Sequence, residues 1–223
     1  MALADRQFAE ARRQMVLTQL RPNKVIDEQV IDAMASVPRE QFVPQAYRGV
    51  AYMDEDVAVA PGRFIMEPMI LARLIQEAEI QPSDVALVVG SATGYDAAVL
   101  ARIANTVIGL ESDPALSQQA GQTLQALGID NVATVEGPLA AGLPKQGPFN
   151  VILLAGAVPE ISQTLLDQLA DGGRLVGVLR PFDAPIGQAV LVKRSDHLFA
   201  QRVLFDAGTP LLPGFERPAG FVF

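Results

Sequence analysis

The chain has 223 residues, of which 50% are hydrophobic and 19% charged, so it can bury one sizeable core and is not a disordered protein. Its 25 acidic residues outnumber the 17 Lys and Arg, and the net charge of -8 leaves little positive potential to hold a nucleic acid. The sequence contains no cysteine and one histidine, His197, which excludes disulfides, thiolate nucleophiles and Cys- or multi-His-ligated metal centres. We therefore expect no nucleic-acid partner and no metal site.

The N-terminal residues do not resemble a secretion signal. Residues 1–14 mix charged and small apolar side chains and lack an apolar central region. The longest apolar runs, 85–89 and 151–158, are far shorter than the ~20 residues that span a bilayer. We interpret the protein as cytoplasmic, without a membrane partner.

Helical spacing dominates the first 80 residues. Apolar residues recur at helical intervals over 4–20, again between the cap residue Asp27 and the breaker Pro38, and over 67–79. A short strand is predicted around 57–59, before a turn. These elements precede the main fold.

From residue 85 onward, strands and helices alternate. The predicted strands are 85–89, 106–110, 132–135, 151–154 and 175–179, and the predicted helices are 95–103, 114–127 and 161–169. This alternation predicts an α/β fold with a parallel sheet and right-handed crossovers. Two further strand-like runs, 188–193 and 198–205, have no helix between them, so we expect an antiparallel hairpin at the sheet edge.

No linker rich in Gly, Ser or Pro divides the chain, so we predict a single domain over 1–223. Within it we distinguish an N-terminal helical appendage over 1–50, a loop region with one helix over 51–82, and the α/β core over 83–223.

The strongest chemical signal is the loop of residues 90–94 (GSATG) between a buried strand and a helix, with Glu111 ending the next strand. Small residues allow close backbone approach, the helix N-terminus offers N–H groups, and the acid can accept hydrogen bonds from ribose hydroxyls. The loop alone also fits an ordinary tight turn, but together with Glu111 it favours a nucleoside site. Asp96 stands where a dinucleotide fingerprint has its third glycine, which disfavours a diphosphate. A cofactor with adenosine and no phosphate, such as S-adenosylmethionine, fits better.

Five segments spread over nearly the whole chain resemble the protein-L-isoaspartate O-methyltransferase family: 13–20 (RQMVLTQL), 37–44 (VPREQFVP), 94–101 (GYDAAVLA), 128–132 and 159–173. The resemblance implies a Rossmann-like methyltransferase sheet of seven strands, mostly parallel with a C-terminal antiparallel hairpin. It also implies S-adenosylmethionine as methyl donor and, as acceptor, the carboxylate of isoaspartyl residues in peptides or proteins, in protein repair. Because a carboxylate is already ionised at pH 7, this reaction needs no general base.

The resemblance also assigns site residues. The implied cofactor-binding residues are Gly90, Ser91, Ala92, Gly94, Glu111, Gly137 and Leu139, and the implied substrate-binding residues are Arg63, Ile65, Met66 and Glu67. The chain departs from the family pattern at four places: Val88 replaces an acid, Ala92 replaces a glycine, Pro138 and Leu139 replace Asp-Gly, and Met66 replaces the substrate-binding serine. We assign no catalytic residue.

Two functions stay open. The chain is either a divergent methyltransferase, whose acceptor has changed with its substrate loop, or a binding or regulatory protein that keeps the fold without methyl transfer. Three side chains are candidates for filling the hollow above Gly90, namely Met66, Val88 and Leu139.

Other residues have competing interpretations. Arg63 can pair with an acidic ligand or with Glu67, or it can be an ordinary surface charge. The acidic run 54–56 is either a solvated loop or a cation site. The phenylalanines near the C-terminus are expected to cover the sheet edge or the pocket mouth, or to mark a partner surface if exposed; they are Phe205, Phe215, Phe221 and Phe223.

Overall fold

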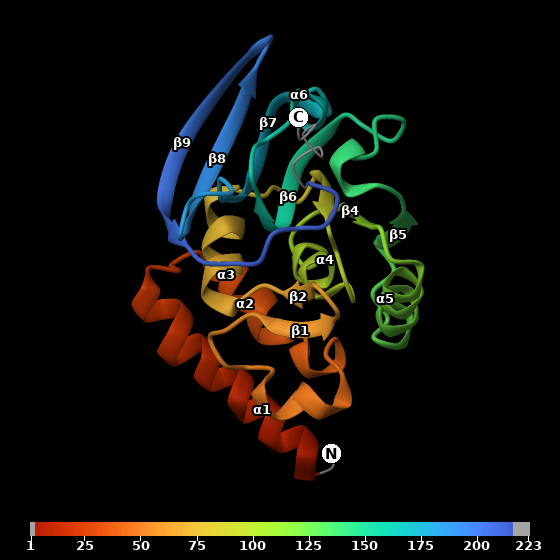
Figure 1. Cartoon of the computed structure of the whole chain (residues 1–223). Coiled ribbons are helices and arrows are strands. Elements are labelled where there is room, and N and C mark those ends of the chain that lie inside the picture. The colour runs from red at the N-terminus through yellow and green to blue at the C-terminus, as the bar shows by residue number, and fades with distance from the viewer. Residues whose placement is uncertain (1–2, 216–223) are drawn as a thin grey trace, which may run out of the picture.

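A computed structural model describes residues 3–215 and contains a central sheet of seven strands (Figure 1). In chain order, these strands are β3 (Val85–Val89), β4 (Thr106–Glu111), β5 (Val132–Glu136), β6 (Phe149–Val158), β7 (Leu169–Leu179), β8 (Gly187–Ser195) and β9 (Leu198–Ala207). They lie side by side in the order β5-β4-β3-β6-β7-β8-β9. Strands β3 to β7 are parallel, whereas β8 and β9 run antiparallel to their neighbours. The predicted fold class is confirmed.

Strands β6 and β7 differ most from the prediction in length. Strand β6 continues four residues past the predicted end at Leu154, and β7 begins at Leu169, where we expected the end of a helix. The pairing of Phe149 with Leu169 starts the β6–β7 ladder early and leaves helix α6 (Gln163–Leu166) as a single turn. Tertiary pairing therefore overrides the local helical pattern here.

The remaining helices are α1 (Leu3–Met15), α2 (Glu28–Ser36), α3 (Pro68–Glu77), α4 (Tyr95–Leu100) and α5 (Pro114–Ala126), with short turns η1 (Val16–Leu20), η2 (Arg21–Asn23), η3 (Arg39–Gln41), η4 (Gln45–Val50) and η5 (Leu139–Ala141). The predicted helix over 4–20 changes to a π-helical turn at Val16, which directs Val16 and Leu20 into the core. Asp27 caps α2 as expected, because its carboxylate accepts from the Gln29 N–H at 2.8 Å.

The strands carry two separate apolar clusters, one on each face of the sheet. Successive residues of a strand point to opposite faces, and accordingly Val88 belongs to the first cluster and Val89 to the second. Side chains of α2, α3 and α4 fill the first cluster, whereas the second contains Leu139, Leu165 and Leu212. The second cluster therefore depends on short segments rather than long helices, and one of them comes from the C-terminal part of the chain.

Ahead of α3, strands β1 (Val57–Ala60) and β2 (Arg63–Ile65) form an antiparallel hairpin, of which only the first strand was predicted. Two acids of the run 54–56 hold the start of α3: Asp56 accepts from the Glu67 N–H and Asp54 from the Met69 N–H, both at 3.1 Å. Within residues 3–215 no group of three or more acidic, His or Cys residues is arranged to hold a metal ion. The acidic run caps a helix instead.

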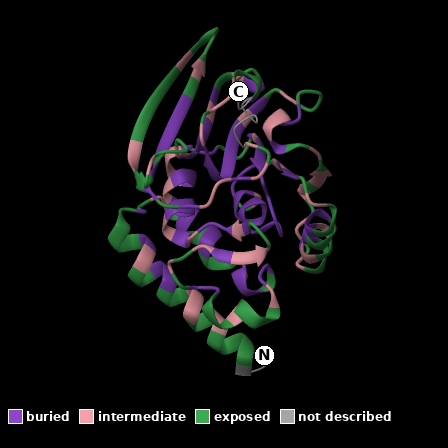
Figure 2. Cartoon of the chain, in the orientation of Figure 1, coloured by how far each residue is buried: buried purple, intermediate pink, exposed green. Residues whose placement is uncertain are grey.

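The hairpin of β8 and β9 forms the outer edge of the sheet, and β9 is largely exposed (Figure 2). His197 lies exposed in its turn. Phe205 is half-buried, with the Arg73 guanidinium 3.5 Å from its ring centre, and Phe215 packs against the second cluster. Phe221 and Phe223 lie outside the described residues. Among residues 3–215, no helix has the length and apolar character needed to cross a membrane.

Candidate functional site

The candidate site lies where three parallel strands end at the same edge of the sheet. Strand β3 leads into the loop 90–94 and α4, β4 ends at Glu111, and β6 passes Ala155 and Gly156. The order of the strands reverses at β3, because the chain continues outward to β4 and β5 and then returns to β6 on the other side. In open α/β sheets, ligands bind at such a switch point. The fold therefore places the loop and Glu111 where a nucleoside would be held.

The loop has a strained backbone at one residue. Gly90 and Gly94 have φ of +82° and +93°, and a Cβ at Gly94 would lie 3.1 Å from that of Ala120, so both positions favour glycine. Ala92 also lies in the left-handed region, at φ +47°. For a residue with a Cβ this conformation costs roughly 1–2 kcal/mol. The alanine thus occupies a conformation that suits glycine.

Glu111 is fully buried, with 0% of its surface exposed. Its Oε2 accepts from the Arg63 guanidinium and, at 2.7 Å, from the Ala92 N–H. Its Oε1 accepts from the N–H groups of Ser112 and Asp113 at 2.8 and 3.0 Å. The carboxylate predicted to bind ribose hydroxyls already has a full set of donors from this chain.

Arg63 lies inside the site and is 5% exposed. Its ion-pair partner is neither a ligand nor Glu67, two of the interpretations left open, but Glu111, 48 residues further along the chain. One guanidinium nitrogen also lies 3.5 Å from the position that a Cβ on Gly90 would take. Arg63 therefore covers the loop and neutralises Glu111.

Leu212 fills the space above the loop and is 4% exposed. A Cβ built on Gly90 would lie 2.6 Å from one of its methyl groups, and one built on Gly156 would lie 2.7 Å from the same group. The segment that carries it runs beside β6, where the Ala157 N–H donates to Pro210 O at 2.9 Å and the Leu212 N–H donates to Ala157 O at 2.8 Å. The leucine thus packs directly on Gly90, which follows β3, and on Gly156, which lies within β6.

The space left beside Arg63 and Leu212 is a cavity of about 10 Å³, lined by residues 62–64, 155–156 and 209–212. A cavity of this size has room for about one water molecule, whereas small-molecule sites usually measure ~300–1,000 Å³. This cavity beside Arg63 and Leu212 is too small to hold S-adenosylmethionine.

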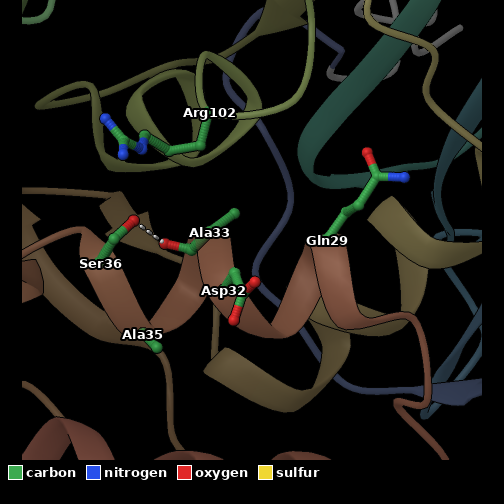
Figure 3. A pocket seen from close by; sticks show the side chains of 6 residues that line it. All are labelled: Gln29, Asp32, Ala33, Ala35, Ser36 and Arg102. Carbon is green, nitrogen blue, oxygen red and sulfur yellow. Dashed lines mark hydrogen bonds between the residues drawn. The ribbon is translucent and has the colours of Figure 1, made fainter.

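A larger hollow lies elsewhere, between α2 and the residues that follow α4 (Figure 3). It measures about 460 Å³ and is lined by Gln29, Asp32, Ala33, Ala35, Ser36 and Arg102. None of these is a predicted site residue, and the Ser36 hydroxyl donates to Ala33 O of its own helix at 2.9 Å. The hollow is separate from the switch point.

Of the three predicted fillers, Leu139 shares the second apolar cluster with Leu212. Val88 and Met66 are buried in the first cluster instead. Leu212 was not among the predicted fillers or site residues. A short apolar run with prolines, residues 210–213, was visible after the last strand, but nothing in it identified the segment that it contacts.

The predicted substrate residues do not form an open binding surface. Ile65 and Met66 are buried, and the Met66 carbonyl accepts from Arg39 at 2.8 Å. Glu67 is half-buried, and burial raises its pKa to about 7, with smaller contributions from Asp54, Asp56 and Glu55. The position predicted for a substrate-binding hydroxyl therefore holds a core methionine beside an acidic loop.

Asp96, in the first turn of α4, lies on the other side of the loop and is buried. Burial raises its pKa to about 7; Asp56 adds to the rise, whereas Arg39 and Arg63 oppose it. In the described part of the chain, six buried side-chain N or O atoms lack a hydrogen-bond partner, and four belong to this neighbourhood: Arg39 Nη1, Arg63 Nε, Ser91 Oγ and Asp96 Oδ1. Each such atom costs about 1–3 kcal/mol. The closed arrangement therefore carries an energetic penalty.

The family model of protein-L-isoaspartate(D-aspartate) O-methyltransferase matches residues 11–204. A protein-L-isoaspartate O-methyltransferase of Koribacter versatilis is 41% identical over 199 residues, covering 89% of this chain and 88% of the relative. One of Herpetosiphon aurantiacus is 40% identical over 182 residues, covering 82% and 78%.

Two solved structures share the fold. A protein-L-isoaspartate O-methyltransferase aligns with a TM-score of 0.81 at 23% identity, covering 92% of this chain and 67% of that one. A putative family member from Plasmodium falciparum, in complex with S-adenosyl-L-homocysteine, aligns with a TM-score of 0.76 at 21% identity, covering 91% and 98%.

Proposed function

The chain belongs to the protein-L-isoaspartate O-methyltransferase family, and we propose that it is a member whose nucleoside site is closed by its own side chains. In this proposal it acts as a binding or regulatory protein and performs no methyl transfer in the closed state. The family uses S-adenosylmethionine as methyl donor and acts on isoaspartyl residues of proteins. The proposal also treats residues 1–223 as one domain, with the helical appendage and the loop region packed on the α/β core.

The observation that carries the proposal is the saturation of Glu111. Its carboxylate accepts five hydrogen bonds from the chain, including one from a buried guanidinium and one from the Ser112 hydroxyl, and 0% of its surface is exposed. A ribose must displace Arg63 to reach it. Separating one partner from a buried ion pair costs about 3–5 kcal/mol, which lowers the affinity of a nucleoside ligand by a factor of about 100 to 1,000 or more.

Leu212 adds a second obstacle, because its side chain occupies the space next to Gly90 and Gly156. Moving it into water removes its burial, which is worth about 1.5–3 kcal/mol for a leucine. Both costs are subtracted from whatever binding energy the cofactor would supply.

A second candidate function is methyl transfer by an opened form. It is favoured by the 41% identity over 89% of the chain with a relative that bears the enzyme's name, and by the retained Gly90, Gly94, Glu111 and Gly137. Met66 and the adjacent acids would then point to a changed acceptor, since an acidic loop repels a carboxylate.

Thermal unfolding with S-adenosylhomocysteine separates the two functions. A ligand that binds only the native state adds RT ln(1 + [L]/Kd), about 2.7 kcal/mol at 100 times Kd. We expect no change in melting temperature at millimolar ligand and no methyl ester on an isoaspartyl peptide, whereas the Koribacter versatilis relative, run in parallel, serves as the positive control. A clear shift or methyl transfer by this chain would favour the second candidate.

A further inference from the structure

We propose that residues 208–214, called the strap below, compete with a nucleoside ligand for the site at Gly90 and Glu111, with Arg63 acting as the second half of the closure. This inference rests on the proposed function, because it explains how the closed state is held. The competing ligand is the nucleoside part of the cofactor that the family uses, whose ribose hydroxyls match the freed carboxylate of Glu111.

The strap is attached to the sheet by a short ladder and one side chain. Ala157 exchanges two backbone hydrogen bonds with it, at 2.9 Å to Pro210 O and 2.8 Å from the Leu212 N–H. The Thr209 hydroxyl donates to Asp56 Oδ1 at 3.1 Å. A single bridge of this kind is much shorter than the ladder between β6 and β7, so it can separate without disturbing the sheet.

Both ends of the strap are glycines. Gly208 has open space where a Cβ would lie, and Gly214 has φ of +81°. Glycine absorbs large changes of backbone angles, which is what a hinge requires. The segment between them carries Thr209, Pro210 and Leu212, the residues that contact the loop region and β6.

The two leucines of the strap face different parts of the protein. Leu212 belongs to the second apolar cluster and packs on Gly90 and Gly156, whereas Leu211 packs against the first cluster. Both leucines line the small cavity of the site, but of the two it is Leu212 that packs on Gly90 and Gly156. Leu211 provides a matched control, because its truncation removes the same atoms from the same segment.

The hydrogen bonding of the polar groups that close the site is incomplete. One guanidinium nitrogen of Arg63 donates a hydrogen bond to Glu111, while its Nε is buried without a hydrogen-bond partner. Asp96 Oδ1 is also buried without a partner. A buried polar group without a partner disfavours the conformation that contains it. The closed state is thus held mainly by Leu212 and the Arg63–Glu111 pair, which identifies the two residues to change.

The test uses the full chain with Leu212→Ala alone, with Arg63→Gln and Leu212→Ala together, and with Leu211→Ala. Glutamine can still donate to Glu111, and Leu212→Ala alone keeps the test valid if the double variant does not fold. We expect the melting temperature of the opened variants to rise by about 3–6 °C when S-adenosylhomocysteine is at about ten times Kd. Wild type and Leu211→Ala should not shift at the same concentration.

The outcomes separate this inference from the proposed function. If a folded opened variant shows no shift while the wild type also shows none, the strap does not compete with a nucleoside, and the proposed function stands. If the wild type itself shifts, the proposed function fails; the strap is then overturned unless Leu212→Ala binds at least about tenfold more tightly. An equal rise in melting temperature with ligand in Leu211→Ala also overturns the inference, because the gain would then come from a general destabilisation of the strap.

Discussion

Two buried carboxylates flank the loop of residues 90–94, and their surroundings differ. On the β4 side, Glu111 has a guanidinium, three backbone N–H groups and the Ser112 hydroxyl as donors. On the α4 side, Asp96 has an oxygen without a partner, and burial raises its pKa to about 7. Burial without a hydrogen-bond partner disfavours the charged form of a carboxylate, as at Asp96. The closed site is therefore stabilised on one side and carries a cost on the other.

The largest loss of stability is expected when the Arg63–Glu111 ion pair is broken. Arg63→Met leaves the charge of Glu111 buried without its cation, so we expect a loss of about 3–5 kcal/mol in the free energy of unfolding, measured by urea denaturation. Adding Glu111→Gln should recover at least about half of that loss, because the amide keeps an acceptor and removes the charge.

The matched control is Arg21→Met. Arg21 pairs with Glu28 on the surface, with 44% and 65% of the two side chains exposed, and exposed pairs contribute about 0–1 kcal/mol. Equal losses for Arg63→Met and Arg21→Met would show that the Arg63–Glu111 pair does not hold the site closed.

The second-largest effect is expected at Asp96, whose contribution to the free energy of unfolding depends on pH. The folded-state pKa of Asp96, about 7, lies above its ordinary value of 3.8, so the folded protein holds a proton that the unfolded chain releases. This contribution to stability is fully present below pH 3.8 and is lost as the pH rises to about 7.

Asp96→Asn removes this titration. We compare the free energy of unfolding of the variant with that of wild type at each pH. This difference should shift in favour of the variant by about 2–4 kcal/mol between pH 4 and pH 8, because each pKa unit corresponds to 1.36 kcal/mol. Urea denaturation at the two pH values measures the difference. Glu67→Gln should show the same sign with a smaller size, because Glu67 is only half-buried. A pH-independent difference for Asp96→Asn would contradict the account of Asp96.

The smallest effect lies in the loop between the two carboxylates. Ala92→Gly relieves the left-handed strain but increases the freedom of the unfolded chain, so we expect a net stabilisation of about 0.5–1 kcal/mol. Ala115→Gly, in the first turn of α5, is the control and should destabilise by a similar amount. Destabilisation by Ala92→Gly would show that the alanine is not strained.

Local pattern was sufficient for most of the fold. The strands that follow residue 85 were visible as apolar runs, and the position of Glu111 at the end of β4 followed from its place after such a run. The loop 90–94 was identified by its glycines, two of which adopt positive φ. These features are determined by residues close together in the sequence, so they could be predicted from it.

The state of the site could not be predicted in the same way, because it depends on distant contacts. Arg63 and Glu111 are 48 residues apart, and Leu212 reaches Gly90 from the far end of the chain. Asp54 and Asp56 likewise could not be distinguished from a solvated acidic run, because their hydrogen bonds to the start of α3 appear only in the folded structure. No periodicity encodes these pairings, so charge and apolar character were known while their partners were not.

A crystal structure of the chain grown with millimolar S-adenosylhomocysteine tests the central claim most directly. The account predicts that Leu212 remains against Gly90 and Gly156, that Arg63 remains paired with Glu111, and that no nucleoside density appears between them. An adenosine whose ribose hydroxyls contact Glu111, with Arg63 displaced, would contradict it.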